Sequence, residues 1–396
     1  MNRTALAPLL TLALGAPAAA LPQVEERPKP AFELPRMRDR GTAQARESST
    51  AWCVVAADGA VSRLEGGVLP PEDAGVRAAW TEPLVEAARG ELALLVLADG
   101  QRIVGQVAES EGSPAWVSTW CAARPLGGKL DGIASIEFTA AAAPRATEQD
   151  IVVLRNGDRI DGIVEAIGGK AVTIDRGSAD SQGKVTVELA SVASISLVAT
   201  PAEPSGARVW LRDGSVIDGP RVHWMGDDFL QLPAVPGAKT MTLTVPRRMV
   251  AGFRSAPGSI VPFATARFLV SAPAQGAPVR VGEPSAAALP GSWPLDLAPI
   301  EVEGPVVLSY PAPSTPGSMR MTVARNATVR ASGSPELVIR QGGKELLRRP
   351  LGEQDERVEV AVPVEAGAAI ELSLSRADGM LAGTFMVLER AMLVPR

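Results

Sequence analysis

Short runs of alternating apolar and polar residues follow one another along most of the chain. Met319, Met321 and Val323 fall on one face of an extended segment, and Ile370 and Leu372 do the same further on. The 38 glycines and 34 prolines interrupt the sequence so often that long helical patterns are hard to find. This pattern predicts an all-β protein.

One short pattern occurs three times at a fixed spacing. Its central glycines and its closing glycines both recur every 57 residues, which indicates an internal repeat. The three copies read LADGQRIVG at 97–105, LRNGDRIDG at 154–162 and LRDGSVIDG at 211–219, with central glycines Gly100, Gly157 and Gly214 and closing glycines Gly105, Gly162 and Gly219.

Each copy predicts five short strands. Asp-Gly or Asn-Gly between two β-prone runs favours a two-residue hairpin turn in which both φ angles are positive. The closing glycine lies inside the next strand and predicts a bend where that strand serves two sheets. A second hairpin, a penultimate strand and a final β segment follow, so the expected fold is three tandem small β-barrels of SH3-like or Sm-like type. The predicted domains are 51–140 with an N-terminal extension, 150–199 and 207–256.

The segment AWCVVAADGAVSRLEGG at 51–67 stands apart from this spacing. Its first glycine precedes the next central glycine by 41 residues, so it is out of register. We interpret it as part of the extension of the first barrel; a degenerate extra hairpin is the alternative.

The motif "dG..i.G", followed by a turn, a strand and a final β segment, resembles the small β-barrel repeats of exported planctomycete-type proteins. It is also distantly similar to Sm-like barrels, which bind RNA. The net charge of −5 and the pI of about 5.3 argue against phosphate binding, and no basic patch with interleaved aromatic residues is present. Nucleic acid is therefore excluded as a partner.

The region 257–396 predicts a β-sandwich. Its strands alternate cleanly, and LVIRQGGKELL at 337–347 predicts a hairpin around Gly342-Gly343. The order of features resembles the NPCBM/NEW2 family of jelly-roll modules, named as carbohydrate-binding domains. Four stretches carry the resemblance: SWPLDLAPIEVEGPVVLSYPAP (292–313), PELVIRQGGKELLRRPL (335–351), VEVAVPVEAGAAIELSLSRADG (358–379) and FMVLERAMLVP (385–395). The family's early glycine-leucine-histidine element is missing, and Phe385 or Met386 replaces the tryptophan of its last strand.

The N-terminus predicts a cleaved export signal over 1–20, with Arg3 before an apolar run and Ala18-Ala19-Ala20 as the cleavage region. A membrane anchor is the alternative, but Pro8 and Pro17 crowd an apolar run too short to cross a bilayer. No later segment can span a membrane. The expected location is secreted, or periplasmic in the cell envelope, with 21–50 as a proline-rich disordered lead.

Export also bears on the two cysteines. Cys53 and Cys121 each follow a tryptophan, and an oxidising compartment permits a disulfide between them. Two buried free thiols are the alternative.

No catalytic constellation is present, so no catalytic residue, metal or cofactor is predicted. His223 is the only histidine and is interpreted as an ordinary strand residue, which excludes the common zinc sites. The remaining acidic candidates are interpreted as solvated charge. They are Asp227-Asp228 in a turn, Glu301 and Glu303 on one strand face, and Asp378 before Gly379.

Trp293 and Tyr310 are the best candidates for a sugar-stacking platform, although the sequence favours core packing as the role of each. Asp378 would cap a loop or hold a structural cation. The sequence thus favours a non-catalytic binding or scaffolding protein, with a glycan as the ligand that the family resemblance implies. A structural envelope protein that pairs with other proteins through sheet edges is the alternative, and a secreted hydrolase is a third hypothesis. A sugar binder should expose Trp293 or Tyr310 in a concave face, whereas an assembly module would bury them.

Overall fold

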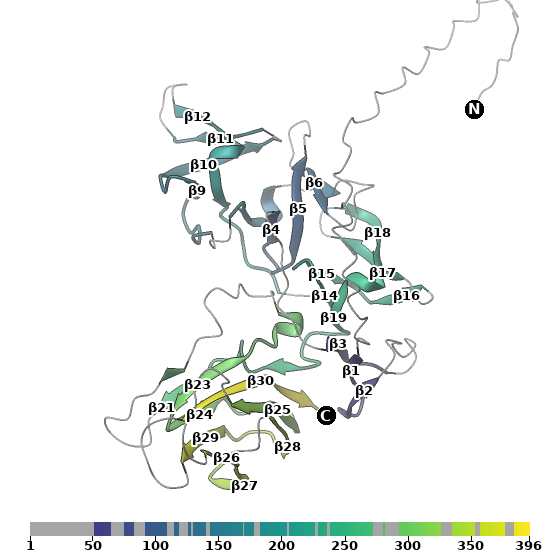
Figure 1. Ribbon diagram of the computed structural model, residues 1–396. Coiled ribbons are helices and arrows are strands. Elements are labelled where there is room, and N and C mark those ends of the chain that lie inside the picture. Colours follow the sequence, from purple (N-terminus) through teal and green to yellow (C-terminus); the bar gives the residue numbers. More distant parts are fainter. Residues whose placement is uncertain are drawn as a thin grey trace, which may run out of the picture. The chain divides into compact units, whose positions relative to one another are not determined.

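The computed structural model describes part of the 396-residue chain: residues 51–64, 75–82, 92–108, 115–118, 126–127, 130–139, 143–168, 170–177, 183–203, 206–225, 229–235, 238–271, 280–281, 293–325, 335–352, 357–376 and 384–396. The chain divides into two compact units, Met1–Ser48 and Ser49–Arg396, and every described residue belongs to the second. The elements in these ranges are β-strands and short 3-10 helices, without an α-helix (Figure 1). The all-β prediction is confirmed. The predicted signal and lead lie outside the described residues.

The strands before residue 255 follow the predicted copies. The N-terminal segment has β1 (Ala51–Val55), β2 (Val61–Leu64) and β3 (Ala78–Glu82). The first copy has β4 (Ala93–Leu97), β5 (Arg102–Ala108), β6 (Ala115–Ser118), β7 (Leu126–Gly127), η2 (Leu130–Gly132) and β8 (Ile133–Glu137). The second copy has β9 (Asp150–Leu154), β10 (Arg159–Ile167), β11 (Ala171–Asp175), β12 (Lys184–Glu188), η4 (Leu189–Ser191) and β13 (Val192–Ser196). The third copy has β14 (Ala207–Leu211), β15 (Val216–Gly219), β16 (His223–Met225), β17 (Phe229–Val235), β18 (Ala238–Pro246), η5 (Arg247–Met249) and β19 (Val250–Arg254).

The copies share one strand order. In the second copy the order is β12-β11-β10-β9-β13, and in the first it is β7-β6-β5-β4-β8. In the third copy the second strand is interrupted after Gly219, so β15-β14-β19 and β16-β17-β18 belong to different sheets. Every pairing in the three copies is antiparallel.

The prediction of separate closed barrels is wrong: none of the described sheets closes on itself. A strand has two hydrogen-bonding edges, and the last strand of each copy uses its second edge on another copy. β13 lies between β9 and β8, and β19 lies between β14 and β3. The copies therefore join edge to edge in one long sheet. In this sheet β5 of the first copy pairs with β15 of the third copy at Arg102 and Val216.

The three repeated turns differ from the predicted geometry. The N–H groups of Gly100, Gly157 and Gly214 donate to the carbonyl oxygen three residues earlier, at 3.0, 2.9 and 3.1 Å, and the glycine φ angles are 80°, 92° and 94°. The Asp or Asn before each glycine does not share the positive φ, since the non-glycine residues with positive φ in the described ranges all follow residue 290. This is a type I turn followed by a left-handed glycine, which makes a three-residue loop. The Asp or Asn side chain instead accepts the N–H two residues ahead, in the pairs Asp99–Gln101, Asn156–Asp158 and Asp213–Ser215.

The closing glycine has the predicted role in β10. Residues 159–162 of this strand pair with β9, and residues 163–167 pair with β11. A Cβ atom on Gly162 would come within 2.8 Å of Ile174 Cγ2 and would collide with the Asp175 carbonyl. Glycine is needed here because β11 crosses directly over the bend.

The segment 51–82 is a partial fourth copy. Ala56 N–H donates to Ala60 O and Gly59 N–H donates to Ala56 O, both at 2.9 Å, and Asp58 Oδ1 accepts the Ala60 N–H at 2.8 Å. The repeated turns have the same three bonds. The alternative of an extra hairpin at 51–67 is thus confirmed.

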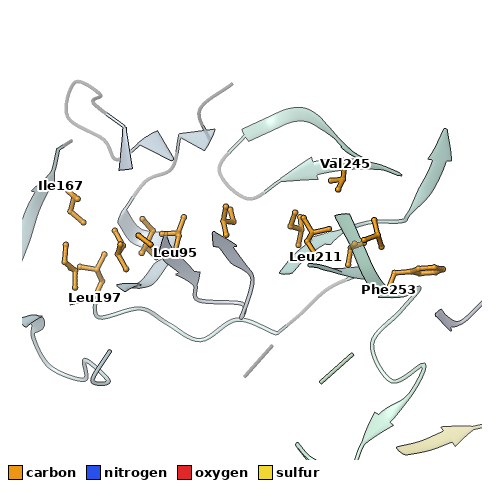
Figure 2. Close-up of a cluster of buried hydrophobic side chains, with 14 of the residues drawn as sticks. Leu95, Ile167, Leu197, Leu211, Val245 and Phe253 are labelled. Carbon is orange, nitrogen blue, oxygen red and sulfur yellow. The ribbon is translucent and has the colours of Figure 1, made fainter. Parts of the chain in front are cut away.

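The four copies share one hydrophobic core. The cluster contains buried side chains from every copy, including Trp52, Leu95, Ile167, Leu211 and Phe253. Figure 2 shows part of this cluster. Because a single core stabilises all four copies, we expect them to unfold together rather than one at a time.

The C-terminal region has the two sheets of the predicted sandwich. Its elements are β20 (Val261–Pro262), β21 (Leu269–Ser271), β22 (Arg280–Val281), η6 (Pro294–Asp296), β23 (Ile300–Gly304), β24 (Val306–Tyr310), β25 (Gly317–Arg325), β26 (Pro335–Gln341), β27 (Lys344–Pro350), β28 (Arg357–Val364), β29 (Ile370–Arg376) and β30 (Thr384–Pro395). One sheet has the order β22-β23-β30-β25-β28 with β20 beside β30, and the other has the order β21-β24-β29-β26-β27. The alternating apolar residues point into a core that both sheets share. The hairpin at Gly342-Gly343 is confirmed, with φ angles of 56° and 82°.

A third cluster of buried side chains joins the repeats to the C-terminal region. Trp80 and Trp210 from the repeats pack in one cluster with Leu295, Met392 and Val394.

Arg390 adds a polar link beside this cluster. It is the extra residue of a β-bulge between β25 and β30, with φ of 52°. Its guanidinium pairs with Glu82 of β3 and donates to Thr322 Oγ1 at 2.5 Å and to Glu359 Oε1 at 2.7 Å. The left-handed backbone of the bulge therefore directs one arginine onto acceptors from both parts.

Candidate functional site

The structure corrects the prediction for Tyr310 as an exposed platform. Tyr310 is 2% exposed, and its ring stacks on Phe263 with centroids 4.2 Å apart and lies 5.3 Å from the ring of Phe268. Burial raises the pKa of the Tyr310 hydroxyl, which has no hydrogen-bond partner in the described part of the chain. Tyr310 is a core residue because the face of β24 that carries Val306 and Leu308 points inward.

The other predicted candidates are scattered or undescribed. Asp378, Asp227 and Asp228 lie outside the described residues. Glu301 is exposed on β23 with Glu303 partly buried, and the exposed His223 lies on β16 of the third copy. Within the described ranges, no three histidine, cysteine or acidic side chains gather as a metal-ligand set.

Cys53 is a free, buried thiol in the structure. Burial, a hydrogen bond to Glu82 and the charge of that carboxylate raise the pKa of Cys53 to about 12. The predicted partner, Cys121, lies outside the described residues, so the disulfide stays a prediction.

In the folded protein the Cys53 thiol should react slowly with thiol reagents at mildly alkaline pH. A pKa near 12 leaves it protonated at pH 8, where Ellman's reagent would label it only after unfolding in urea. The same pKa makes stability depend on pH. The stability that the neutral thiol contributes is fully present below the ordinary thiol pKa of 9.0, and it is lost as the pH rises from there towards about 12. Rapid labelling of native Cys121→Ser protein, in which Cys53 is the one remaining thiol, would contradict this burial. A urea-unfolded, unreduced sample of the wild type without free thiols would instead show the disulfide.

Trp293 is the predicted candidate that stays partly exposed. It is the N-cap of η6, and its carbonyl accepts the Asp296 N–H at 3.0 Å. The two residues Leu295 and Asp296 have φ angles of 56° and 57°, a left-handed conformation that costs energy for residues with side chains. Such strain persists only where surrounding contacts hold it.

Those contacts come from the repeats. Cys53, Trp80, Gly252 and Trp210 lie next to one another across β1, β3, β19 and β14. Gly252 leaves a gap between the two tryptophans, and Leu295 fills it: a Cβ on Gly252 would overlap Leu295 Cδ1 and lie 3.0 Å from Ala79 O. Leu295 is 1% exposed. Its burial fixes the turn that carries Trp293.

A buried ion pair lies on the same face of the repeats. Arg208 Nε donates to Asp218 Oδ1 at 2.6 Å and Arg208 Nη2 donates to Oδ2 at 2.7 Å, with a further bond of 3.0 Å from Nη2 to Asp99 O. Asp218 N–H donates to Gln101 Oε1 at 2.8 Å. Burial opposes the charge of Arg208, but the hydrogen bonds and charge of Asp218 outweigh it and raise the pKa of Arg208. Since Asp99 and Gln101 belong to the first copy, this network also connects the first and third copies.

Arg254 lies directly opposite Arg208 in the pairing of β14 with β19. Its guanidinium carbon is 5.6 Å from the centre of the Trp210 ring, a cation–π contact. Burial and the nearby Arg208 lower the pKa of Arg254, while Asp296 and Asp218 oppose that shift. The opposite charges of Arg254 and Asp296 thus attract each other where the repeats meet the η6 turn.

Sequence reasoning missed Arg208, Asp218, Arg254 and Leu295. One signal was available: in the run ARVWL the third copy has Arg208 where the second has Ile151, although both strands are apolar. A charge inside a buried strand needs a partner, and comparison of the copies would have pointed to this position.

No protein-family model matches the sequence, and no curated protein matches it. The solved structures to which the chain is similar include several that contain family 51 carbohydrate-binding modules (CBM51). The CBM51-2 and INT domains of Clostridium perfringens ZmpB share 11% identity over 42% of this chain and 36% of that one, with a TM-score of 0.28. The CBM51 of Clostridium perfringens GH95, in complex with methyl-galactose, shares 10% over 34% and 99% of the two chains, with a TM-score of 0.27. The tandem CBM51 modules of Sp3GH98 from Streptococcus pneumoniae share 11% over 77% and 88%, with a TM-score of 0.26. TM-scores at this level do not establish a shared fold, so the resemblance to the NPCBM/NEW2 family stays a prediction.

Proposed function

We propose that this chain is an exported, non-catalytic binding protein that holds a glycan at Trp293. The observation that carries the proposal is the partly exposed Trp293 on a turn fixed by the buried Leu295. A sugar packs its C–H face on a flat ring, and a ring held in place loses little freedom on binding. Of the two aromatic residues named in the sequence criterion for a sugar binder, Tyr310 is buried and Trp293 is partly exposed, which supports Trp293 as the platform.

The charges around the turn favour binding over catalysis. Both carboxylate oxygens of Asp218 accept hydrogen bonds from Arg208, so this group is not free to act as a base. Export is part of the proposal and rests on the signal pattern in residues 1–20. In the described ranges no helix has the length and apolar character that a membrane crossing requires.

The proposal is tested by applying the purified full chain to a glycan array, followed by calorimetry with the glycans that bind. Methyl-galactose, the ligand in the complex of the Clostridium perfringens GH95 module, is one of the first ligands for the calorimetry. Trp293→Ala should weaken binding by about 5- to 150-fold, because stacking on an aromatic ring contributes on the order of 1–3 kcal/mol. Trp224→Ala is the matched control, since Trp224 is also partly buried but packs edge-on against Phe253 in the third copy. A blank array, or equal affinities for the wild type and Trp293→Ala, would refute the proposal.

A second candidate function is pairing with another envelope protein. Among the described strands β21 pairs with β24 alone and forms an edge of its sheet, where Leu269 is 76% and Val270 46% exposed. An exposed apolar edge strand can add a strand from a partner. Capture of an envelope protein that is lost in Leu269→Lys but kept in Trp293→Ala would favour this function.

A further inference from the structure

Arg254 is a partly buried cation without an anionic partner among the described residues. In the described part of the chain its side chain makes neither a hydrogen bond nor an ion pair, and its Nε is fully buried. Only Nε is both buried and unpaired, so the two terminal nitrogens, Nη1 and Nη2, keep accessible surface. An unpaired charge at a partly buried position is costly, and such a group is a candidate for ligand recognition.

The neighbouring arginine shows what Arg254 lacks. Arg208 lies opposite it and is satisfied by the two oxygens of Asp218, whereas Arg254 rests on Trp210 without a carboxylate. Asp296 acts on both arginines through its charge, but no ion pair with Arg254 results. Two like charges directly opposite each other on paired strands repel, and an added anion would relieve that repulsion.

The position of Arg254 also connects it to the proposed glycan site. Gly252, two residues earlier on the same face of β19, is in contact with Pro294 and Leu295 of the η6 turn. Trp293 precedes these residues directly. Arg254 and the η6 turn that carries Trp293 therefore belong to the same junction.

We propose that Nη1 and Nη2 of Arg254 bind the carboxylate of an acidic sugar, a uronic acid, in the glycan held at Trp293. This inference rests on the proposed function and adds the chemical class of the ligand. A carboxylate fits because its two oxygens match the planar pair of guanidinium nitrogens, and each bond carries opposite charges. A cationic sugar would instead be repelled by the charge of Arg254.

The experiment compares oligosaccharides of galacturonic and glucuronic acid with their methyl esters, which keep the ring and remove the charge. Calorimetry with the full chain should show tighter binding of the acid than of the ester, by about 10- to 100-fold. Arg254→Gln should lower the affinity for the acid to that for the ester. Arg176→Gln, which removes the same charge from an exposed position in the second copy, should keep the wild-type preference.

Further measurements separate binding from a structural role. Among the described residues Arg254 has a cation–π contact with Trp210 but no ion pair, so Arg254→Gln should change the thermal midpoint little. A large drop in the midpoint with unchanged sugar preference would assign Arg254 to stability instead. Arg254→Lys should show an intermediate preference, because an ammonium group cannot bind both carboxylate oxygens side by side.

The failures of the two proposals are distinct. Equal binding of acid and ester that remains sensitive to Trp293→Ala would refute the role of Arg254 and keep the glycan site. A preference for the acid that survives in Arg254→Gln would do the same. Absence of binding to any sugar would refute the proposed function and this inference with it.

Discussion

Replacing Asp218 with asparagine is expected to lower the free energy of unfolding by about 3–5 kcal/mol, because it leaves a buried arginine without its counter-charge. Arg208 and Asp218 are 8% and 6% exposed, and Asp218 provides both oxygens that accept the Nε and Nη2 protons of Arg208. The loss should also weaken the link between the first and third copies, since Arg208 and Asp218 contact Asp99 and Gln101. Urea denaturation followed by tryptophan fluorescence measures the change.

The repeat supplies a matched control for this substitution. Asp161 stands 57 residues before Asp218 at the same place in the second copy and pairs with Arg159. Both side chains of this pair are exposed, Arg159 to 55% and Asp161 to 44%. Asp161→Asn should therefore change the free energy of unfolding by only about 0–1 kcal/mol. Equal losses in the two variants would show that the buried pair is no more important than the surface pair.

Gly252→Val should destabilise the chain by about 2–4 kcal/mol, because the new side chain takes the space that Leu295 fills. The Cβ would overlap Leu295 Cδ1 and press on the Ala79 carbonyl, which the sheet holds in place. Once Leu295 leaves its position, the η6 turn no longer has the contacts that maintain its left-handed backbone. Thermal and urea unfolding give the size of the loss, and glycan affinity gives its effect on Trp293.

A double-mutant cycle identifies the cause. If Gly252→Val acts through Leu295, the combination with Leu295→Ala should cost less than the two single losses added together, with a coupling of about 0.5–3 kcal/mol. Gly132→Ala is the control, since Gly132 has no atom within 4 Å of the added Cβ and should tolerate it. Strict additivity would place the damage in the backbone of β19 rather than at Leu295.

Local patterns were enough to place most strands. Alternation identified the inward faces of β25, β28 and β29, and the Asp-Gly and Asn-Gly pairs marked the hairpins of the three copies. The turn type was wrong because Asp and Asn also satisfy a type I turn by accepting a backbone N–H, which leaves positive φ to the glycine alone.

The pairing between copies could not be predicted in the same way. Every strand has two edges of identical backbone groups, and the side-chain pattern says which face is buried but not which neighbour lies beside the strand. The prediction assumed that β13 would complete its own barrel, whereas its second edge pairs with β8. The partial fourth copy was hard to find for a related reason, since its glycine, Gly59, breaks the 57-residue spacing although its turn bonds are the same.

Part of the candidate site was available from strand parity. Val306, Leu308 and Tyr310 are spaced by two residues, so a buried β24 should have placed the Tyr310 ring inside. Trp293 lies outside any strand, where parity gives no information. Arg254 became a candidate only through residues distant in sequence, namely Arg208, Trp210 and Asp296.

The edge pairing β8–β13 joins the first and second copies, and β3–β19 joins the N-terminal and third copies. Each copy thus covers the outer edge of one other copy, so the four copies form two pairs. Deletion of a single copy by recombination would leave the copy paired with it with an edge strand of unpaired N–H and C=O groups, which is prone to aggregation. Proteins built on this plan should gain and lose such copies two at a time.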